Sequence, residues 1–160
     1  MYYKKKYMSP IGELFLESDG NALTGLYFDE ARIRKEAEAV DNEPVEQHVF
    51  ADAGSWLDMY FKGKKPDFTP PLRLHGTEFQ LEVWRILINI PYGETVTYGH
   101  IAEMIAADRN VEKISAQAVG GAVGKNPVAI IVPCHRVIGS GGKLTGYAGG
   151  LEKKEALLRL

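Results

Sequence analysis

The chain contains one cysteine, Cys134, and the segment IIVPCHRVIG places His135 and Arg136 directly after it. A thiolate is a strong nucleophile, and a neighbouring imidazole or cation can take the thiol proton or lower the thiol pKa. The apolar run 130–132 is typical of a strand, and Pro133, which lacks an N–H, is expected to end it. Adjacent strand residues point to opposite faces, so contact between Cys134 and His135 requires a bend or a bridging water. The pattern indicates nucleophilic chemistry, with a buried structural cysteine as the alternative.

Two further segments add polar and flexible groups near this cysteine in the sequence. Asn126 precedes a proline in GKNPVAI, so its backbone is expected to be extended while its amide can hydrogen-bond two segments at once; an ordinary turn asparagine is the alternative. Downstream, GSGGKLTGYAGG holds six glycines in twelve residues. Such a loop is either flexible or lets a flat ligand lie against the main chain, and Tyr147 offers an aromatic face for stacking.

The elements that must position these groups predict an α+β fold with two domains. In the first half, ELFLES and LTGLYF flank the turn signal Asp19-Gly20-Asn21 and indicate a small antiparallel sheet. Helical spacing in VEQHVFADAGSWLDMYFKG predicts a helix that ends at Gly63. The segment KKPDFTPPLRLHG, with three prolines, sets the predicted boundary between a scaffold domain at 1–74 and a second domain at 75–160.

The second domain is predicted to be mainly helical. Thr77 with Gln80 has the spacing of a capping box before EFQLEVWRILINI, and Thr97 is placed to cap YGHIAEMIAA. The next helix, ISAQAVGGAVGKN, consists largely of Ala, Gly and Ser. These two short helices resemble a helix-turn-helix, with two ordinary packed helices as the alternative. The small side chains would let the helix backbone approach a groove wall closely.

Composition limits the remaining possibilities. A net charge of −2 shows no basic excess, and no apolar run approaches the roughly 20 residues that span a bilayer. The N-terminal MYYKKKY lacks the apolar stretch of a signal peptide. One cysteine excludes an internal disulfide and a cysteine-based zinc site and fits a reducing compartment, so we expect a cytoplasmic protein. The histidines outside this segment, His48, His75 and His100, lack metal-ligand spacing, and we expect neither metal nor cofactor.

Four motifs together, NPVAIIVPCHRVIG, VTYGHIA, AVGGAVGKNP and LTGYAGG, resemble the O6-alkylguanine-DNA alkyltransferases, also called methylated-DNA–protein-cysteine methyltransferases. The similarity is strong over about 76–160 and weaker at SPIGELFL and YFKGKKPDF. It implies DNA repair by direct reversal: an alkyl group moves irreversibly from O6 of guanine to Cys134. The thioether product has no easily cleaved bond, so each molecule would act once. The implied partner is double-stranded DNA carrying O6-alkylguanine, with O4-alkylthymine left open, and we expect a monomer.

The resemblance also implies roles for individual residues. Three would perform or support the chemistry: Cys134, His135 and Asn126. Five would bind the flipped base: Tyr98, Val137, Tyr147, Ala148 and Gly149. Five would contact DNA, four of them on a helix in the minor groove: Ala116, Gln117, Ala118, Gly120 and Arg136.

The sequence departs from the family pattern at two places. Gln117 stands where many relatives have an arginine that fills the gap left by the flipped base. The acid that orients the family's histidine would fall one position after Leu160, so either the chain is truncated or another carboxylate substitutes; Glu155 would face elsewhere on a regular helix. Two other functions remain open: a damage-recognition module that binds DNA without chemistry, and a cysteine hydrolase that turns over.

Overall fold

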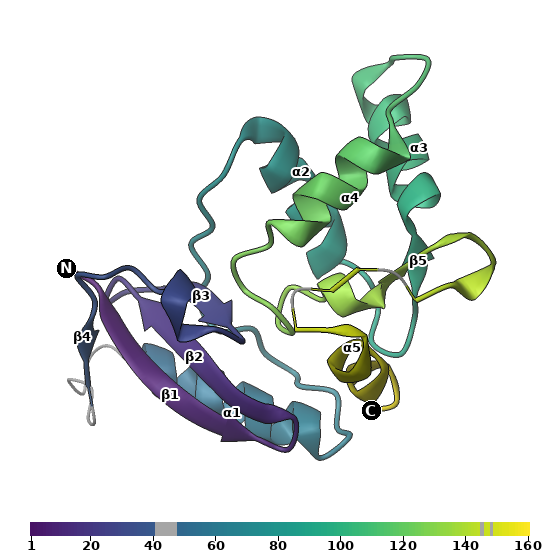
Figure 1. Cartoon of the computed structure of the whole chain (residues 1–160). Coiled ribbons are helices and arrows are strands. Elements are labelled where there is room, and N and C mark those ends of the chain that lie inside the picture. The colour runs from purple at the N-terminus through teal and green to yellow at the C-terminus, as the bar shows by residue number, and fades with distance from the viewer. Residues whose placement is uncertain (41–47, 145, 148) are drawn as a thin grey trace. The chain divides into compact units, whose positions relative to one another are not determined.

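The structure is a computed structural model that describes residues 1–40, 48–144, 146, 147 and 149–160 (Figure 1). The chain forms two compact units, Met1–His75 together with Leu160, and Gly76–Arg159. The predicted α+β class is confirmed, with the sheet in the first unit and most helices in the second. No helix in the described ranges is long and apolar enough to cross a membrane.

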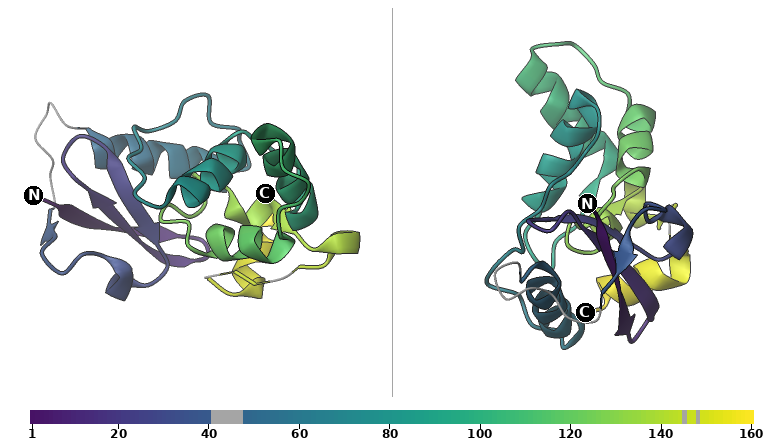
Figure 2. Two further views of the ribbon diagram at one scale, coloured as in Figure 1. Left: turned by 90° about the horizontal axis from the view of Figure 1, so that it is seen from above. Right: turned by 90° about the vertical axis from the view of Figure 1, so that its left-hand side faces the viewer.

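The first unit is a four-stranded sheet with one long helix against it. The strands are β1 (Tyr3–Ser9), β2 (Gly12–Ser18), β3 (Leu23–Tyr27) and β4 (Glu38–Ala39), in the order β3-β2-β1-β4. The first three pair antiparallel as predicted, whereas the short β4 pairs parallel with β1. The predicted helix is α1 (Val49–Phe61), and it lies along one face of the sheet (Figures 1 and 2).

A buried carboxylate joins the sheet to the short helix η1 (Glu30–Arg32) and the residues after it. Glu17 on β2 is fully buried and accepts hydrogen bonds from Thr24 Oγ1 at 2.7 Å and from the Arg34 backbone N–H at 2.9 Å. The Arg34 guanidinium also pairs with it. A buried charge needs such partners, so this cluster fixes the segment that follows β3.

Three helices form the core of the second unit: α2 (Glu78–Ile88), α3 (Tyr98–Arg109) and α4 (Ala116–Gly124). The predicted capping box at Thr77 and Gln80 is present, and Thr97 caps α3 by accepting from the His100 N–H. Trp84 on α2 donates from Nε1 to the Ala122 carbonyl of α4 at 2.8 Å. The tryptophan therefore holds α4 against α2 through a backbone contact.

The remaining elements of this unit are short. They are η2 (Cys134–Arg136), η3 (Ser140–Gly142), α5 (Leu151–Leu158) and two strands, β5 (Val96–Thr97) and β6 (Val137–Ile138), which pair parallel. The β5–β6 pair matters because it ties the two residues before α3 to the two residues after η2, with Val96 opposite Val137 and Thr97 opposite Ile138. It brings the start of α3 beside the chain that follows the cysteine.

The prediction of a strand at 130–132 is wrong. This segment is a turn, closed by hydrogen bonds from Ile131 N–H to the Ala129 carbonyl and from Val132 N–H to the Val128 carbonyl. Ile130 is fully buried and has φ of 70°, a conformation that β-branched residues rarely adopt. A short apolar run signals burial, but its period alone does not separate a strand from a buried turn.

Candidate active site

Cys134 begins a single turn of 3-10 helix rather than continuing a strand. Its N–H donates to the Val132 carbonyl at 2.8 Å, and its own carbonyl accepts from the Val137 N–H. Pro133 precedes it with φ of −80° and ψ of 64°, which turns the chain at this point. The bend that the sequence required between Cys134 and its histidine is therefore present. Cys134 retains 8% of its surface exposed, whereas His135 retains none.

Asn126 joins the two ends of the turn that leads to the cysteine. Its Nδ2 donates to the Val132 carbonyl at 2.8 Å, and its Oδ1 accepts from the Val128 N–H at 3.0 Å. Its side chain also hydrogen-bonds Cys134, which favours the thiolate. Because Asn126 is itself buried, these bonds fix the distance between the end of α4 and the cysteine.

The electrostatics keep both reactive groups neutral at rest. Burial raises the pKa of the Cys134 thiol, against the lowering effect of hydrogen bonds from Asn126 and Tyr147 and of the Lys154 charge. Burial, with the charges of Arg136 and Lys154, lowers the pKa of His135 to about 3. The imidazole is therefore unprotonated at neutral pH and has a lone pair available. The donors around the sulfur are placed to stabilise charge once the proton leaves.

Lys154 is a site residue that the sequence did not reveal. It lies on α5, is fully buried and donates from Nζ to the Val137 carbonyl at 2.7 Å. In the sequence it belongs to the charged run EKKE, which is typical of an exposed helix face. The burial of Lys154 could have been suspected from its position three residues before the buried Leu157, since positions i and i+3 share a helix face.

Arg136 has internal partners. Its Nη1 donates to the Ile90 carbonyl at 3.2 Å, and its guanidinium lies 5.4 Å from the centre of the Tyr92 ring. Only 8% of the residue is exposed. In this arrangement the arginine ties η2 to the chain that leaves α2.

The residues predicted to bind a base come from two segments. Tyr98 starts α3, beside the β5–β6 pair that contains Val137, and its ring lies close to Gly120 of α4, where an added Cβ would meet it at 3.8 Å. Tyr147 and Gly149 lie in the loop before α5 and are half-buried, and the Tyr147 carbonyl accepts from the Gly150 N–H. Ala148 lies outside the described residues.

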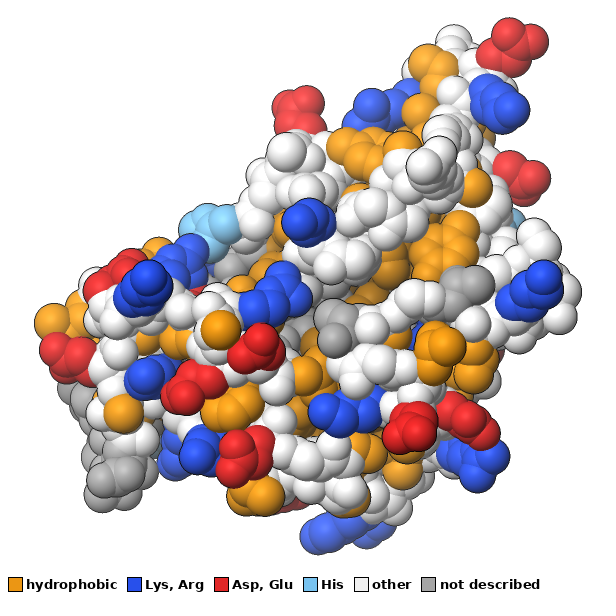
Figure 3. All heavy atoms as spheres, in the orientation of Figure 1, with side chains coloured by type: hydrophobic (Ala, Val, Ile, Leu, Met, Phe, Trp, Pro, Cys, Tyr) orange, Lys and Arg blue, Asp and Glu red, His pale blue; other side chains and the backbone are white. Residues whose placement is uncertain are grey.

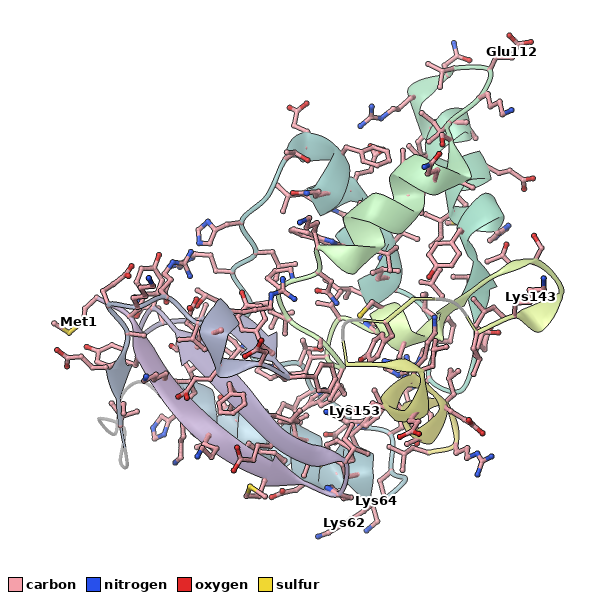
Figure 4. All side chains as sticks on the ribbon, in the orientation of Figure 1. Met1, Lys62, Lys64, Glu112, Lys143 and Lys153 are labelled. Carbon is pink, nitrogen blue, oxygen red and sulfur yellow. The ribbon has the colours of Figure 1, made fainter. Side chains whose placement is uncertain are left out.

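The outward face of α4 carries almost no bulk. Ala116, Gln117 and Ala118 are exposed in its first turn, which Ser115 caps, and two glycines follow on the exposed side: Gly121 and Gly124. An added Cβ at either glycine would meet no atom within 4 Å. Figure 3 shows a mainly uncharged surface over this helix, and the charged Glu112 lies beyond it, on the connection from α3 (Figure 4).

No group of three His, Cys, Asp or Glu side chains in the described part of the chain is placed to hold a metal ion. The site thus combines one thiol, a neutral imidazole and hydrogen-bond donors around the sulfur. The helix α4 adds an exposed face of mostly small residues that allows close contact with a flat or grooved partner.

Comparison with known proteins identifies this arrangement. Residues 78–160 match the family described as 6-O-methylguanine DNA methyltransferase, DNA binding domain, and residues 1–74 match its ribonuclease-like domain. The chain belongs to the 6-O-methylguanine DNA methyltransferase family. The resemblance seen in the four sequence motifs is thereby confirmed.

Relatives cover the whole chain. A methylated-DNA–protein-cysteine methyltransferase of Mycobacterium tuberculosis is 45% identical over 166 residues, which span 100% of this chain and 92% of that protein. Its counterpart in Methanosarcina acetivorans is 46% identical and covers 100% and 97%. A crystal structure of Mycobacterium tuberculosis OGT in complex with DNA superposes with a TM-score of 0.86 at 46% identity, covering 99% of this chain and 91% of that one.

Proposed function

We propose that this protein repairs DNA by moving the alkyl group from O6 of guanine to the sulfur of Cys134, once per molecule. The observation that carries the proposal is the environment of the only cysteine. It is held at the edge of the interior by Asn126, follows a sharp turn and is surrounded by groups that favour its thiolate. Full-length similarity to methylated-DNA–protein-cysteine methyltransferases supports the same chemistry.

The proposed reaction begins with removal of the thiol proton. Neutral His135 accepts it, through a water molecule, and Asn126 and Tyr147 stabilise the thiolate through their hydrogen bonds. The sulfur then attacks the alkyl carbon, and the bond from that carbon to O6 breaks. The bonding electrons remain with guanine, which gains a proton in exchange for the one lost by the thiol. The thioether that forms has no easily cleaved bond, so the thiol is not regenerated.

The base must leave the helix stack to reach the sulfur. In the proposal, the Tyr98 hydroxyl donates to a ring nitrogen of the extruded guanine, and the carbonyls of Cys134 and Val137 accept from its amino group. Tyr147 and Gly149 form the wall, with a backbone N–H of this loop directed at O6. The β5–β6 pair supports this assignment because it fixes the segment of Tyr98 beside that of Val137.

We assign α4 to the minor groove of double-stranded DNA. Ala116, Gln117, Ala118 and Gly120 would line the contact, and the absence of bulk on the exposed side of α4 supports close approach to a groove wall. Gln117, in the first turn, would occupy the gap left by the flipped base. We leave Arg136 out of this contact, although the sequence suggested it, because its guanidinium bonds the Ile90 carbonyl.

The same proposal extends to the whole chain. Residues 75–160 would bind DNA and accept the alkyl group, and residues 1–74 would serve as a scaffold. We propose a monomer, since one thiol and one DNA-binding helix complete the reaction. We propose a cytoplasmic location, because a reactive thiol is preserved by a reducing compartment.

Transfer of a radiolabelled methyl group tests the function. Duplex DNA with labelled O6-methylguanine is mixed with the protein and with Cys134→Ser, and protein-bound label is counted. We expect one label per protein molecule at most, and none on the serine variant. Release of label in excess of protein would indicate a hydrolase, and DNA binding without transfer would indicate a recognition module.

A further inference from the structure

Lys154 occupies a position where a charge is costly. Lysine is almost never fully buried unless it is paired, and an apolar side chain would fill the same space on α5 without desolvation. Figure 4 shows that neighbouring Lys153 also extends from α5, so the helix carries two consecutive lysines. Of these two lysines, Lys154 is the fully buried one, and its Nζ donates to the Val137 carbonyl beside η2. The burial therefore needs an explanation in the site.

The geometry directs this charge at the reactive segment. The Nζ of Lys154 is anchored on the carbonyl of Val137, three residues after the cysteine, and α5 packs against η2. The influence is mutual. The Lys154 charge lowers the pKa of the Cys134 thiol, and the thiolate raises the pKa of Lys154, which burial otherwise lowers.

Histidine does not supply this positive charge. The pKa of His135 is lowered to about 3, so its imidazole is neutral in the free protein near pH 7. Arg136 directs its guanidinium to the Ile90 carbonyl and the Tyr92 ring. Of the groups that lower the thiol pKa, Lys154 is the one that carries a positive charge.

Building on the proposed function, we propose that Lys154 is a positioning residue for alkyl transfer: its ammonium, anchored on the Val137 carbonyl, stabilises the Cys134 thiolate. The residue keeps its protons throughout, and the thiol proton still goes to His135. The Val137 carbonyl that anchors this charge is also one of the two carbonyls proposed to accept from the guanine amino group.

Alkylation of the thiol by iodoacetamide tests this role without DNA. Because Cys134 is the only cysteine, the rate reports its thiolate alone. The rate is measured from about pH 6 to pH 9, where His135 stays neutral and arginine stays charged. Three variants separate charge from hydrogen bonding: Lys154→Met removes both, Lys154→Gln keeps a donor for Val137, and Lys154→Arg keeps the charge. Lys153→Gln is the matched control.

We expect Lys154→Met and Lys154→Gln to react about tenfold more slowly at pH 7 and to reach a given rate about one pH unit higher than wild type, since losing a nearby cation makes the thiolate harder to form. Lys154→Arg should stay close to wild type, and Lys153→Gln should match it. A wild-type profile for Lys154→Gln would overturn the role of the charge and leave only the hydrogen bond.

A reciprocal measurement needs no change at Lys154. In Cys134→Ser the thiolate is absent, so the Lys154 ammonium should titrate at lower pH than in wild type, which NMR of Nζ detects. An unchanged titration would refute the coupling, even if the Met and Gln variants fail to fold. If the pH profile shifts as expected but wild type takes no methyl group from DNA, the proposed function fails while the role of Lys154 at the thiol stands.

Discussion

Adding one methyl group to the exposed side of α4 should make the second unit more stable and its binding to DNA weaker. Gly121 has helical backbone geometry and an exposed surface, and an added Cβ would meet nothing within 4 Å. Replacing glycine by alanine inside a helix is worth about 1 kcal/mol. For a unit the size of Gly76–Arg159 that corresponds to a rise in Tm of roughly 4–8 °C. Gly121→Ala should therefore be more stable than wild type.

The same methyl group should weaken DNA binding. Gly121 lies one turn after Gln117 on the face assigned to the minor groove, where extra volume forces the helix away from the groove wall. A steric cost of about 1 kcal/mol corresponds to a Kd weaker by about fivefold. The assay is fluorescence anisotropy with an undamaged duplex, beside thermal unfolding of the free protein.

Gly54→Ala on α1 is the matched control. That glycine also lies inside a helix with nothing within 4 Å of an added Cβ, so it should gain similar stability in the first unit with unchanged DNA affinity. If Gly121→Ala gains stability and binds DNA as well as wild type, the outward face of α4 does not lie against the groove, and the assignment of that helix is wrong.

Gln117, Asn126 and His135 can each be tested by a single substitution. Gln117→Arg should steepen the fall of log affinity with log salt concentration by about 0.9, the effect of one added phosphate contact, and equal slopes for the two proteins would refute a role in the groove. Asn126→Ala should lower the free energy of unfolding by about 1–3 kcal/mol in urea titrations, because it strands the buried Val128 N–H and removes one of the two donors to the Val132 carbonyl; a loss well below 1 kcal/mol would contradict the bonding described. Since the pKa of His135 is lowered to about 3, only the unfolded chain binds a proton there below about pH 6.5. Stability should therefore fall with decreasing pH, at a slope approaching about 1.4 kcal/mol per pH unit near pH 5, and His135→Gln should flatten that slope.

The helix boundaries could be predicted because their signals are local. The Thr77–Gln80 capping box and the Thr97 cap each depend on residues three apart, and both are present. Gly63, with φ of 76°, follows α1 as its sequence position suggested. The family resemblance could be recognised for a similar reason, because each of its motifs is a contiguous stretch of the sequence.

The features that the sequence did not reveal depend on distant contacts. The left-handed conformation of Ile130 has no local signal, because glycine or asparagine would normally mark such a position. Lys154 is drawn into the interior by the packing of α5 against η2, and its spacing from Leu157 indicates a shared helix face but not the contact with η2. The resemblance implied a DNA contact for Arg136, and the bond from its guanidinium to the Ile90 carbonyl, 46 residues away, has no local signal in the sequence.

The central claim is that one sulfur accepts one alkyl group and keeps it. Intact-mass spectrometry during titration with duplex containing O6-methylguanine measures this directly, followed by mapping of the modified peptide. We predict that each protein molecule gains a single methyl group in place of a hydrogen, that the gain maps to Cys134, and that it stops at one equivalent of DNA. An unmodified protein that nonetheless consumes the lesion, or a methyl group on any other residue, would contradict the account.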